Sequence, residues 1–321
     1  MPVTVSINLC CYNSKRYLKE TLDNIINQSY ENWELVIVND GSTDETELIV
    51  REYIDRGFPI KYLYQENRGI GYSRNKALEL SSGEYVALID HDDLWLPSKL
   101  QRQVDFLIKN PETILCYTDG YFLYGGTKSE VKFSSGSKFH RGSVFPHLIE
   151  HDFISLPSVL INRSLSGDAL FFNPRYRFSE DYELFLRLSL QSKIDFIDEP
   201  LVYYRIHGSN FSNNVNVQIE EDEEIYRSFA AQIQGSGISL RRIRSRLYRG
   251  VVVNLVRQDD PKQAMRYSSY LIRYFSLKNL LTYLLLQFGL HRLLSANTVN
   301  EFRRMKNNLV SLKYIRGPRR K

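Results

Sequence analysis

Cysteine is scarce in this sequence of 321 residues, which contains only Cys10, Cys11 and Cys116. Two of the three are adjacent and lie in a stretch that we predict to be a buried strand, so we expect neither a disulfide framework nor a zinc site. This usage is typical of a protein from a reducing, cytoplasmic compartment. Residues 1–4 lead into the predicted strand without a charged segment and a long apolar segment, so we also expect no secretory signal.

Long apolar runs are missing as well. The most apolar late segment, residues 277–294, is interrupted by the polar and charged residues Lys278, Asn279, Gln287, His291 and Arg292. A membrane-spanning helix needs about 20 mostly apolar residues, so this segment is expected to pack against protein or to lie at an interface.

Charge of one sign dominates only at the end of the chain. The net charge of +5 is small, but every charged residue within residues 303–321 is positive. We expect this basic tail to meet an anionic surface at the inner face of the cell membrane. A solvated tail without a partner is one alternative. Binding to nucleic acid is another, although we expect no such partner, and the sequence carries no signal for an oligomeric state.

Strand and helix patterns alternate four times in the first third of the chain. Strands are predicted at residues 3–9, 35–38, 60–64 and 85–89. Four helices are predicted. The first covers residues 15–27, and the second begins after a capping box formed by Ser42 and Glu45. The third ends at Leu80, and the fourth covers residues 97–109. Such alternation with short connections predicts an α/β fold with a mostly parallel sheet covered by helices on both faces.

The pattern loosens after residue 109. Further strands are predicted at residues 114–117, 159–161, 194–197 and 201–204. A hairpin is expected around residues 121–126, and the Ser-, Lys- and Gly-rich stretch through His140 is where a variable, substrate-facing region is expected. A helix is predicted from about Ser179, with its inward residues at Leu184, Phe185 and Leu188.

An acidic run at residues 220–224 marks a change of composition. Beyond it the spacing is helical, with one apolar face formed by Ile243, Leu247, Val251 and Leu255. We therefore predict a catalytic domain at residues 1–215 and a helical region with the basic tail at residues 216–321.

Three carboxylates follow the fourth predicted strand within four positions, at Asp90, Asp92 and Asp93. Carboxylates this close repel one another unless a cation or hydrogen-bond donors compensate, and Mg²⁺ and Mn²⁺ prefer oxygen ligands of this type. A metal-assisted site is one interpretation of the loop. The alternative is that Asp93 and its neighbours cap the helix predicted to begin near Pro97.

Polar side chains also lie at or just after the ends of the other predicted strands. Together with the acidic loop they comprise Tyr12, Asn13, Asp40, Arg68, Arg74, Asp90 and Asp92. Ligands of open parallel sheets bind beyond the carboxyl ends of the strands. This convergence favours a ligand and metal site over capping alone.

Five segments carry a resemblance to a known family. They are VSI with YN at residues 5–13, VNDGSTD at 38–44, NRG with SRN at 67–75, GEYVALIDHDDLWLP at 83–97, and ED with Leu184 at 180–184. In this order they resemble glycosyltransferase family 2, a family of inverting enzymes with the GT-A nucleotide-sugar fold, over about the first two-thirds of the chain. The resemblance implies a Rossmann-like mixed sheet flanked by helices, followed here by a helical appendage. The sequence departs from many members at Cys10, where they have proline, and at Asn39, where they have aspartate.

The resemblance implies a nucleotide-sugar donor, with UDP as the expected nucleotide. The residues implied to bind it are Cys11, Tyr12, Asn13, Asp40, Arg74 and Asp90. Tyr12 would pack on the base, and Asp40 would accept a hydrogen bond from the imide N–H of uracil. The alternative for Asp40 is that it stabilises its own turn. Arg74 would lie near the nucleotide and Asp90 near the ribose.

The resemblance also implies a divalent ion, Mn²⁺ or Mg²⁺, and a general base. Asp92 would be the direct metal ligand, with Asp90 beside it. His207 would complete the metal shell or reach the diphosphate, although a lone histidine is often structural. Asp181 would take the proton from the acceptor hydroxyl, and Glu180 would bind the acceptor. The alternative for both is capping of a helix N-terminus.

The implied activity is transfer of a sugar from a nucleotide diphosphate to a hydroxyl of a glycan, lipid-linked or protein acceptor. A hydride-transfer enzyme is disfavoured, because the Gly-x-Gly pattern at Gly69 follows the third strand and ends in Arg74 instead of glycine. A phosphotransferase that uses the acidic loop as nucleophile would leave Asp40, Arg74 and Asp181 without a role. A non-catalytic sugar-nucleotide-binding or scaffold protein, recruited through its helical tail, is the remaining alternative.

Overall fold

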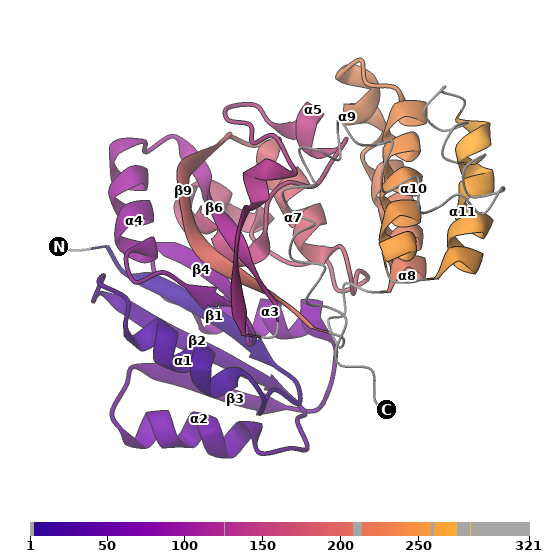
Figure 1. Ribbon diagram of the computed structural model, residues 1–321. Helices are drawn as coiled ribbons and strands as arrows, with labels where there is room; N and C mark the ends of the chain where they lie inside the picture. Colours follow the sequence, from indigo (N-terminus) through magenta and orange to yellow (C-terminus); the bar gives the residue numbers. More distant parts are fainter. Residues whose placement is uncertain (1–2, 125, 208–213, 258–259, 275–282, 284–321) are drawn as a thin grey trace, which may run out of the picture. The chain divides into compact units, whose positions relative to one another are not determined.

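The structure is a computed structural model that describes residues 3–124, 126–207, 214–257, 260–274 and 283 (Figure 1). The chain forms two compact units, one of Met1–Phe145 with Phe153–Asn213 and one of Pro146–Asp152 with Asn214–Lys321. Every residue predicted to bind a ligand or to react lies in the first unit.

The first unit is built on a nine-stranded sheet in the order β3-β2-β1-β4-β8-β6-β9-β5, with β7 paired to β6. The strands are β1 (Val5–Cys11), β2 (Trp33–Asp40), β3 (Ile60–Gln65), β4 (Tyr85–Asp90), β5 (Leu94–Trp95), β6 (Thr113–Tyr124), β7 (Thr127–Lys132), β8 (Leu160–Asn162) and β9 (Lys193–Ile206). Pairing is parallel from β3 through β4 and between β6 and β9, whereas β8 is antiparallel to both β4 and β6. This mixed sheet confirms the predicted fold class.

Helices cover both faces of the sheet. The longer ones are α1 (Leu18–Ile26), α2 (Thr46–Asp55), α3 (Ile70–Leu80), α4 (Lys99–Lys109) and α7 (Glu180–Ser189). Shorter ones are α5 (Phe145–Leu148), α6 (Arg163–Ser166), η1 (Phe133–Ser135), η2 (Leu156–Ser158) and η3 (Gly167–Ala169). In α7 the predicted inward residues Leu184, Phe185 and Leu188 are fully buried.

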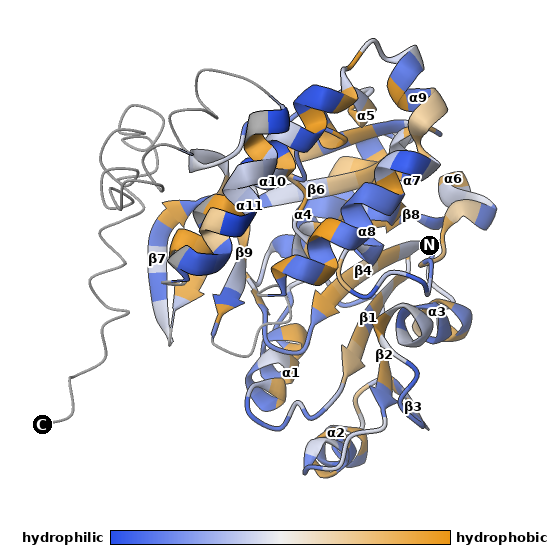
Figure 2. Ribbon diagram, turned by 90° about the vertical axis from the view of Figure 1, so that its right-hand side faces the viewer, coloured by the Kyte–Doolittle hydropathy of each residue, from blue (hydrophilic) through white to orange (hydrophobic). Residues whose placement is uncertain are grey.

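Successive side chains of β1 point to opposite faces of the sheet and pack in two separate hydrophobic cores. Val5, Ile7 and Leu9 pack with apolar residues of α1, α2 and α4, whereas Cys10 packs on the opposite face with Ala77 of α3. Figure 2 shows α1 and α2 on one side of these strands, whose hydrophobic residues are orange, and α3 on the other side. The loops that follow the strands are therefore anchored between two packed layers.

Strand β9 is longer than the sequence indicated. Two strands were predicted at residues 194–197 and 201–204, but a single strand of 14 residues pairs with β6 across both. The register shifts around Asp119 and Gly120, where a bulge accommodates Pro200 opposite Asp119. A side chain at Gly120 would meet the Phe133 ring at 2.4 Å, so this crowded position requires glycine. The predicted hairpin forms from β6 and β7.

The predicted capping box before α2 is wrong. Helix α2 begins at Thr46, and its N-cap Glu45 makes no side-chain capping bond. Asp44 instead accepts the N–H of Thr46 at 3.0 Å, while the Ser42 hydroxyl accepts the N–H of Asn13 at 2.9 Å. A partner that is distant in the sequence outcompetes the local cap for the Ser42 side chain.

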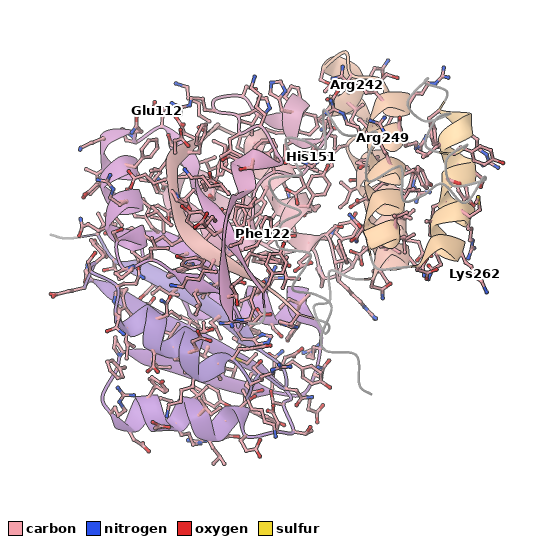
Figure 3. All side chains as sticks on the ribbon, in the orientation of Figure 1. Glu112, Phe122, His151, Arg242, Arg249 and Lys262 are labelled. Carbon is pink, nitrogen blue, oxygen red and sulfur yellow. The ribbon has the colours of Figure 1, made fainter. Side chains whose placement is uncertain are left out.

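The second unit contains α8 (Val215–Ser228), α9 (Ala230–Gly235), α10 (Leu240–Arg257) and α11 (Pro261–Arg273). Glu150, from the segment 146–152, pairs with Arg242 at 2.7 Å and with Arg246 at 2.5 Å. Arg242 and Arg249 project from α10 (Figure 3). A segment from the middle of the sequence thus belongs with the helices, and the division into functional domains after residue 215 stays a prediction.

Within the described ranges, no helix combines the length and apolar character needed to cross a membrane. The apolar segment 277–294, apart from Tyr283, and the basic tail 303–321 lie outside the described residues.

Lys99 is a buried cation in the core of the first unit. Its side chain is fully buried, and Nζ donates to the carbonyl oxygen of Val159 at 3.3 Å and lies 4.1 Å from the ring centroid of Trp95. Burial lowers the pKa of Lys99 to about 7. The unfolded chain keeps a lysine pKa near 10.4, so it binds a proton that the folded chain has lost. This difference reduces the free energy of unfolding as the pH falls from about 10 to about 7.

Replacing Lys99 with methionine should therefore stabilise the first unit at pH 7, by an amount on the order of a few kcal/mol. The gain should shrink as the pH rises from about 7 to about 10 and vanish above that, where lysine is neutral in both states. Thermal unfolding followed by the fluorescence of Trp33 and Trp95, the only tryptophans, measures it. Lys109→Met at an exposed site of the same helix is the control. Equal effects of both substitutions, or a gain that does not change with pH, would contradict this account.

Candidate active site

The strands that carry the predicted site residues end at one edge of the sheet. Parallel pairing places Cys10 of β1 beside Val38 of β2 on one side and Asp90 of β4 on the other. Strand β9 runs in the same direction, because it is parallel to β6, which like β4 is antiparallel to β8. His207, directly after β9, therefore reaches the same edge as Asp40 and Asp90.

The loops after β1 and β2 are bonded to each other. The Asn13 side-chain oxygen accepts the N–H of Thr43 at 2.9 Å, and the N–H of Asn13 donates to the Ser42 hydroxyl. The N–H of Ser14 donates to the hydroxyl of Thr46 at 2.8 Å. Asn13 has a φ of 50°, a left-handed conformation that asparagine tolerates better than most residues. Its side chain thus shapes this edge of the sheet.

The first three predicted nucleotide residues differ in exposure. Tyr12 is 52 % exposed at the edge of the sheet, so its ring is available to a ligand. The Cys11 side chain is 1 % exposed and packs in the core shared with α1. Strand alternation therefore turns the thiol inward, and the contact of Cys11 with a nucleotide stays a prediction.

The two departures from the family pattern face opposite sides of the sheet. Cys10 lies on the α3 side, where burial raises the pKa of its thiol to about 12. Asn39 lies on the other side, where its amide donates to the Tyr62 hydroxyl at 2.9 Å and its oxygen accepts the N–H of Ser42. Asn39 therefore shapes the turn after β2.

Asp40 holds the loop that follows β3. One carboxylate oxygen accepts the Gln65 amide at 2.7 Å and the N–H of Arg68 at 2.9 Å, and the other accepts the N–H of Gly69 at 2.8 Å. The loop approaches so closely that a side chain at Gly41 would lie 2.8 Å from the nitrogen of Asn67. A carboxylate has about four acceptor positions, so room remains for one ligand donor. The uracil contact of Asp40 stays a prediction.

Arg74 of α3 connects two acidic segments. Its Nη1 donates to Glu180 Oε1 at 2.5 Å, and its Nη2 donates to Asp90 Oδ1 at 2.9 Å. The Arg74 and Glu180 side chains are only 9 % and 6 % exposed. The other Glu180 oxygen is buried without a hydrogen-bond partner in the described part of the chain. Direct contact between Glu180 and an acceptor is therefore disfavoured, because its carboxylate is enclosed with Arg74.

Asp181 belongs to the same charged group. Burial raises its pKa, and the nearby Arg74 cation opposes that shift. Burial likewise raises the pKa of Glu180, and the Arg74 cation opposes that shift. One Asp181 oxygen accepts the N–H of Tyr182 at 2.8 Å, the kind of first-turn contact that the capping alternative expects. A carboxylate accepts several hydrogen bonds, so this contact is compatible with a role as base.

The end of β9 holds the acidic loop. His207 Nε2 lies 2.8 Å from Asp92 Oδ2. Arg205 donates from Nε to the Asp92 carbonyl oxygen at 2.6 Å and from its N–H to Asp93 Oδ1 at 2.8 Å. The capping alternative for Asp93 is wrong, because its carboxylate binds Arg205 and α4 begins only at Lys99.

Helix α1 and the residues that flank it support this loop through side chains that sequence reasoning missed. The Thr21 hydroxyl donates to the carbonyl oxygens of His91 and Asp93, and the Asn24 and Gln28 amides donate to those of Trp95 and Leu96. The ring of Tyr17 stacks on His207 with centroids 5.0 Å apart. The available signal was a row of polar residues at helical spacing, at positions 21, 24 and 28, on an otherwise amphipathic helix.

The Asp92–His207 pair offers a carboxylate oxygen and an imidazole nitrogen. This donor set fits Mn²⁺ or Mg²⁺ once water and phosphate oxygens complete the coordination. Across the described ranges, no three His, Cys, Asp or Glu side chains converge into a complete cage. One Asp90 oxygen is occupied by Arg74, so its contribution to a metal site stays a prediction.

Comparison with known proteins identifies a matching family model and several similar proteins. Residues 6–155 match the model described as Glycosyl transferase family 2. An uncharacterized glycosyltransferase of Rickettsia typhi is 31% identical over 234 residues, 71% of this chain and 72% of the relative. TuaG of Bacillus subtilis, named for teichuronic acid biosynthesis, is 32% identical over 215 residues, 65% of this chain and 82% of the relative. WfgD of Escherichia coli, a UDP-Glc:alpha-D-GlcNAc-diphosphoundecaprenol beta-1,3-glucosyltransferase, is 28% identical over 228 residues, 70% of this chain and 86% of the relative.

Solved structures share the fold. TarS of S. aureus, residues 1–349 in complex with UDP-GlcNAc, matches with a TM-score of 0.61 at 19% identity and covers 97% of this chain and 92% of its own. The mannosyltransferase PcManGT of Pyrobaculum calidifontis, in complex with GDP-Man and Mn²⁺, matches with a TM-score of 0.58 at 17% identity, over 99% of this chain and 89% of its own. At these identities the likeness concerns the fold, which is of the GT-A type.

Proposed function

The chain belongs to family 2 of the glycosyltransferases, which use nucleotide sugars, and we propose that it is a metal-dependent inverting enzyme with UDP as the donor nucleotide. The observation that carries this proposal is the Arg74 bridge between Asp90, at the end of β4, and Glu180, next to Asp181. A base and a donor-side carboxylate are thereby held in one charged group.

The nucleotide would bind over the loops after β1, β2 and β3. These loops are bonded to one another through Asn13 and Asp40, and the exposed ring of Tyr12 offers a surface on which a base can stack. This binding surface is formed before the ligand binds, so the loops need little further ordering on binding. WfgD is named for UDP-Glc and TarS was solved with UDP-GlcNAc, which supports uracil as the base. PcManGT was solved with GDP-Man instead.

Asp181 would act as the general base. The acceptor hydroxyl loses its proton to the Asp181 carboxylate while its oxygen attacks the sugar on the face opposite the departing diphosphate, which inverts the anomeric centre. The raised pKa makes the carboxylate a stronger base, and the adjacent Arg74 cation opposes that rise and so favours the ionised form.

Asp92 and His207 would hold Mn²⁺ or Mg²⁺, with Asp90 nearby, and the bound ion would offset charge on the diphosphate as a Lewis acid. Arg205 and Tyr17 keep Asp92 and His207 in place through the contacts already given. This support fixes the ligands before a metal binds, as the outer partners of metal ligands do in other proteins.

The acceptor would be a hydroxyl of a glycan, a lipid-linked glycan or a protein. The names of TuaG and WfgD support a polysaccharide or a lipid-linked precursor. A cytoplasmic position at the inner membrane face would suit such acceptors, and the positive charge of residues 303–321 would favour it.

Replacing Asp181 with asparagine should lower sugar transfer by about 10²- to 10⁴-fold, because the amide cannot accept the proton. UDP binding, measured by calorimetry, should remain. Asp168→Asn, at an exposed position before α7, is the control and should transfer normally. If D181N transfers at the wild-type rate, the base lies elsewhere. If the wild-type chain binds UDP-sugars but neither hydrolyses nor transfers them, the non-catalytic binding alternative is supported.

Replacing Asp92 with asparagine should weaken Mn²⁺ binding at least about 10-fold, because a charged ligand is lost. Electron paramagnetic resonance of free Mn²⁺ in the presence of UDP measures this without turnover. Asp168→Asn, at the exposed position before α7, serves as the control here as well. Unchanged Mn²⁺ affinity in D92N would remove Asp92 from the metal site.

Salt should release the full-length chain from membranes, because the attraction of its basic tail to anionic lipid is screened. Fractionation at low and high ionic strength, with and without residues 298–321, measures this. A chain that stays bound at high salt, or that binds equally without the tail, would rule out this mode of attachment.

A further inference from the structure

Helix α3 is locked to the segment that leads into α7. The Asn75 amide donates to the carbonyl oxygen of Phe172 and its oxygen accepts the N–H of the same residue, both at 2.7 Å. A side chain at Gly71 would lie 3.1 Å from Pro174 Cα, so the two segments are in close contact. The path from α3 to the start of α7 is therefore short and tightly packed.

Arg74 lies between these anchors. Its guanidinium carbon is 5.3 Å from the centroid of the Phe172 ring, and its two terminal nitrogens bind carboxylates on separate elements. Charge-assisted bonds in a buried setting are strong and directional. The planar guanidinium therefore sets the spacing between Asp90 and Glu180.

Glu180 links the position of Arg74 to the position of Asp181. It is the first residue of α7 and directly precedes Asp181. Its carboxylate is enclosed and bonded to Arg74, which leaves it poorly placed to touch an acceptor. Movement of Glu180 would move the first turn of α7, and the Asp181 carboxylate with it.

We propose that Arg74 and Glu180 are positioning residues that hold the Asp181 base in register with the donor-side Asp90, and that neither acts by contacting the acceptor. This inference rests on the proposed function, because it concerns the base of that reaction. Lysine cannot replace arginine here, since one ammonium group cannot bind two carboxylates with the fixed fork of a guanidinium.

Kinetics of Arg74→Lys and Glu180→Gln test the pair. Each should lower kcat by about 10- to 100-fold, the effect of a displaced catalytic group, while KM for the donor and the affinity for UDP change less than about threefold. Arg187→Lys is the matched control, because Arg187 forms a similar pair with Glu183 on the same helix without touching Asp90. It should affect stability alone. A rise in donor KM with unchanged kcat would show instead that Arg74 binds the nucleotide.

The pH dependence of kcat/KM in the Arg74→Gln variant distinguishes positioning of the base from a purely structural role, because a purely structural role of Arg74 would leave this pH dependence unchanged. Arg74 lowers the pKa of Asp181 and Asp90 raises it, and Glu180, which is bonded to Arg74, directly precedes Asp181 in the chain. Its removal should shift the acid limb of kcat/KM to higher pH. A folded variant with an unshifted limb and wild-type kcat would overturn the pairing, whereas full transfer by D181N would overturn the base assignment itself.

Discussion

One buried guanidinium determines how this site is assembled. Arg74 is withdrawn from water, and an isolated charge in that position would cost several kcal/mol. Asp90 and Glu180 offset the cost, and they belong to elements that are far apart in the sequence. Breaking either contact would leave a buried charge without a partner. The end of β4 and the start of α7 are therefore held together as one group.

The other end of the acidic loop is also held by residues that are distant in the sequence. Arg205 bonds to the Asp92 carbonyl and the Asp93 carboxylate, and α1 donates side-chain hydrogen bonds to the carbonyl oxygens of the loop. Asp40 likewise holds the loop after β3. These two loops are each tied to a neighbouring element and not only to themselves. Such preorganisation is what electrostatic catalysis requires, because groups already in place need not reorganise as charge develops.

The arrangement separates two tasks within the first unit. Loops after the first three strands, held by Asn13 and Asp40, form the binding surface proposed for the nucleotide. The first turn of α7 carries the proposed base, and Asp92 with His207 carries the proposed metal ligands. Family membership explains why these parts occur together. The burial of Glu180 beside Arg74 supports the proposal that Glu180 positions the base and does not contact the acceptor.

The sequence by itself determined the elements and the edge at which function lies. Apolar residues at a period of two or 3.6 located most strands and helices, and polar residues after strand ends pointed to the site, because both signals are local. Tertiary structure alone decided that Cys11 points into the core, that Ser42 bonds to Asn13 instead of capping α2, and that β9 is one bulged strand. It also decided that Asp93 binds Arg205 and that Arg74 encloses Glu180. These outcomes depend on partners that lie far along the chain, and a buried polar group takes whichever partner the fold brings within hydrogen-bond distance.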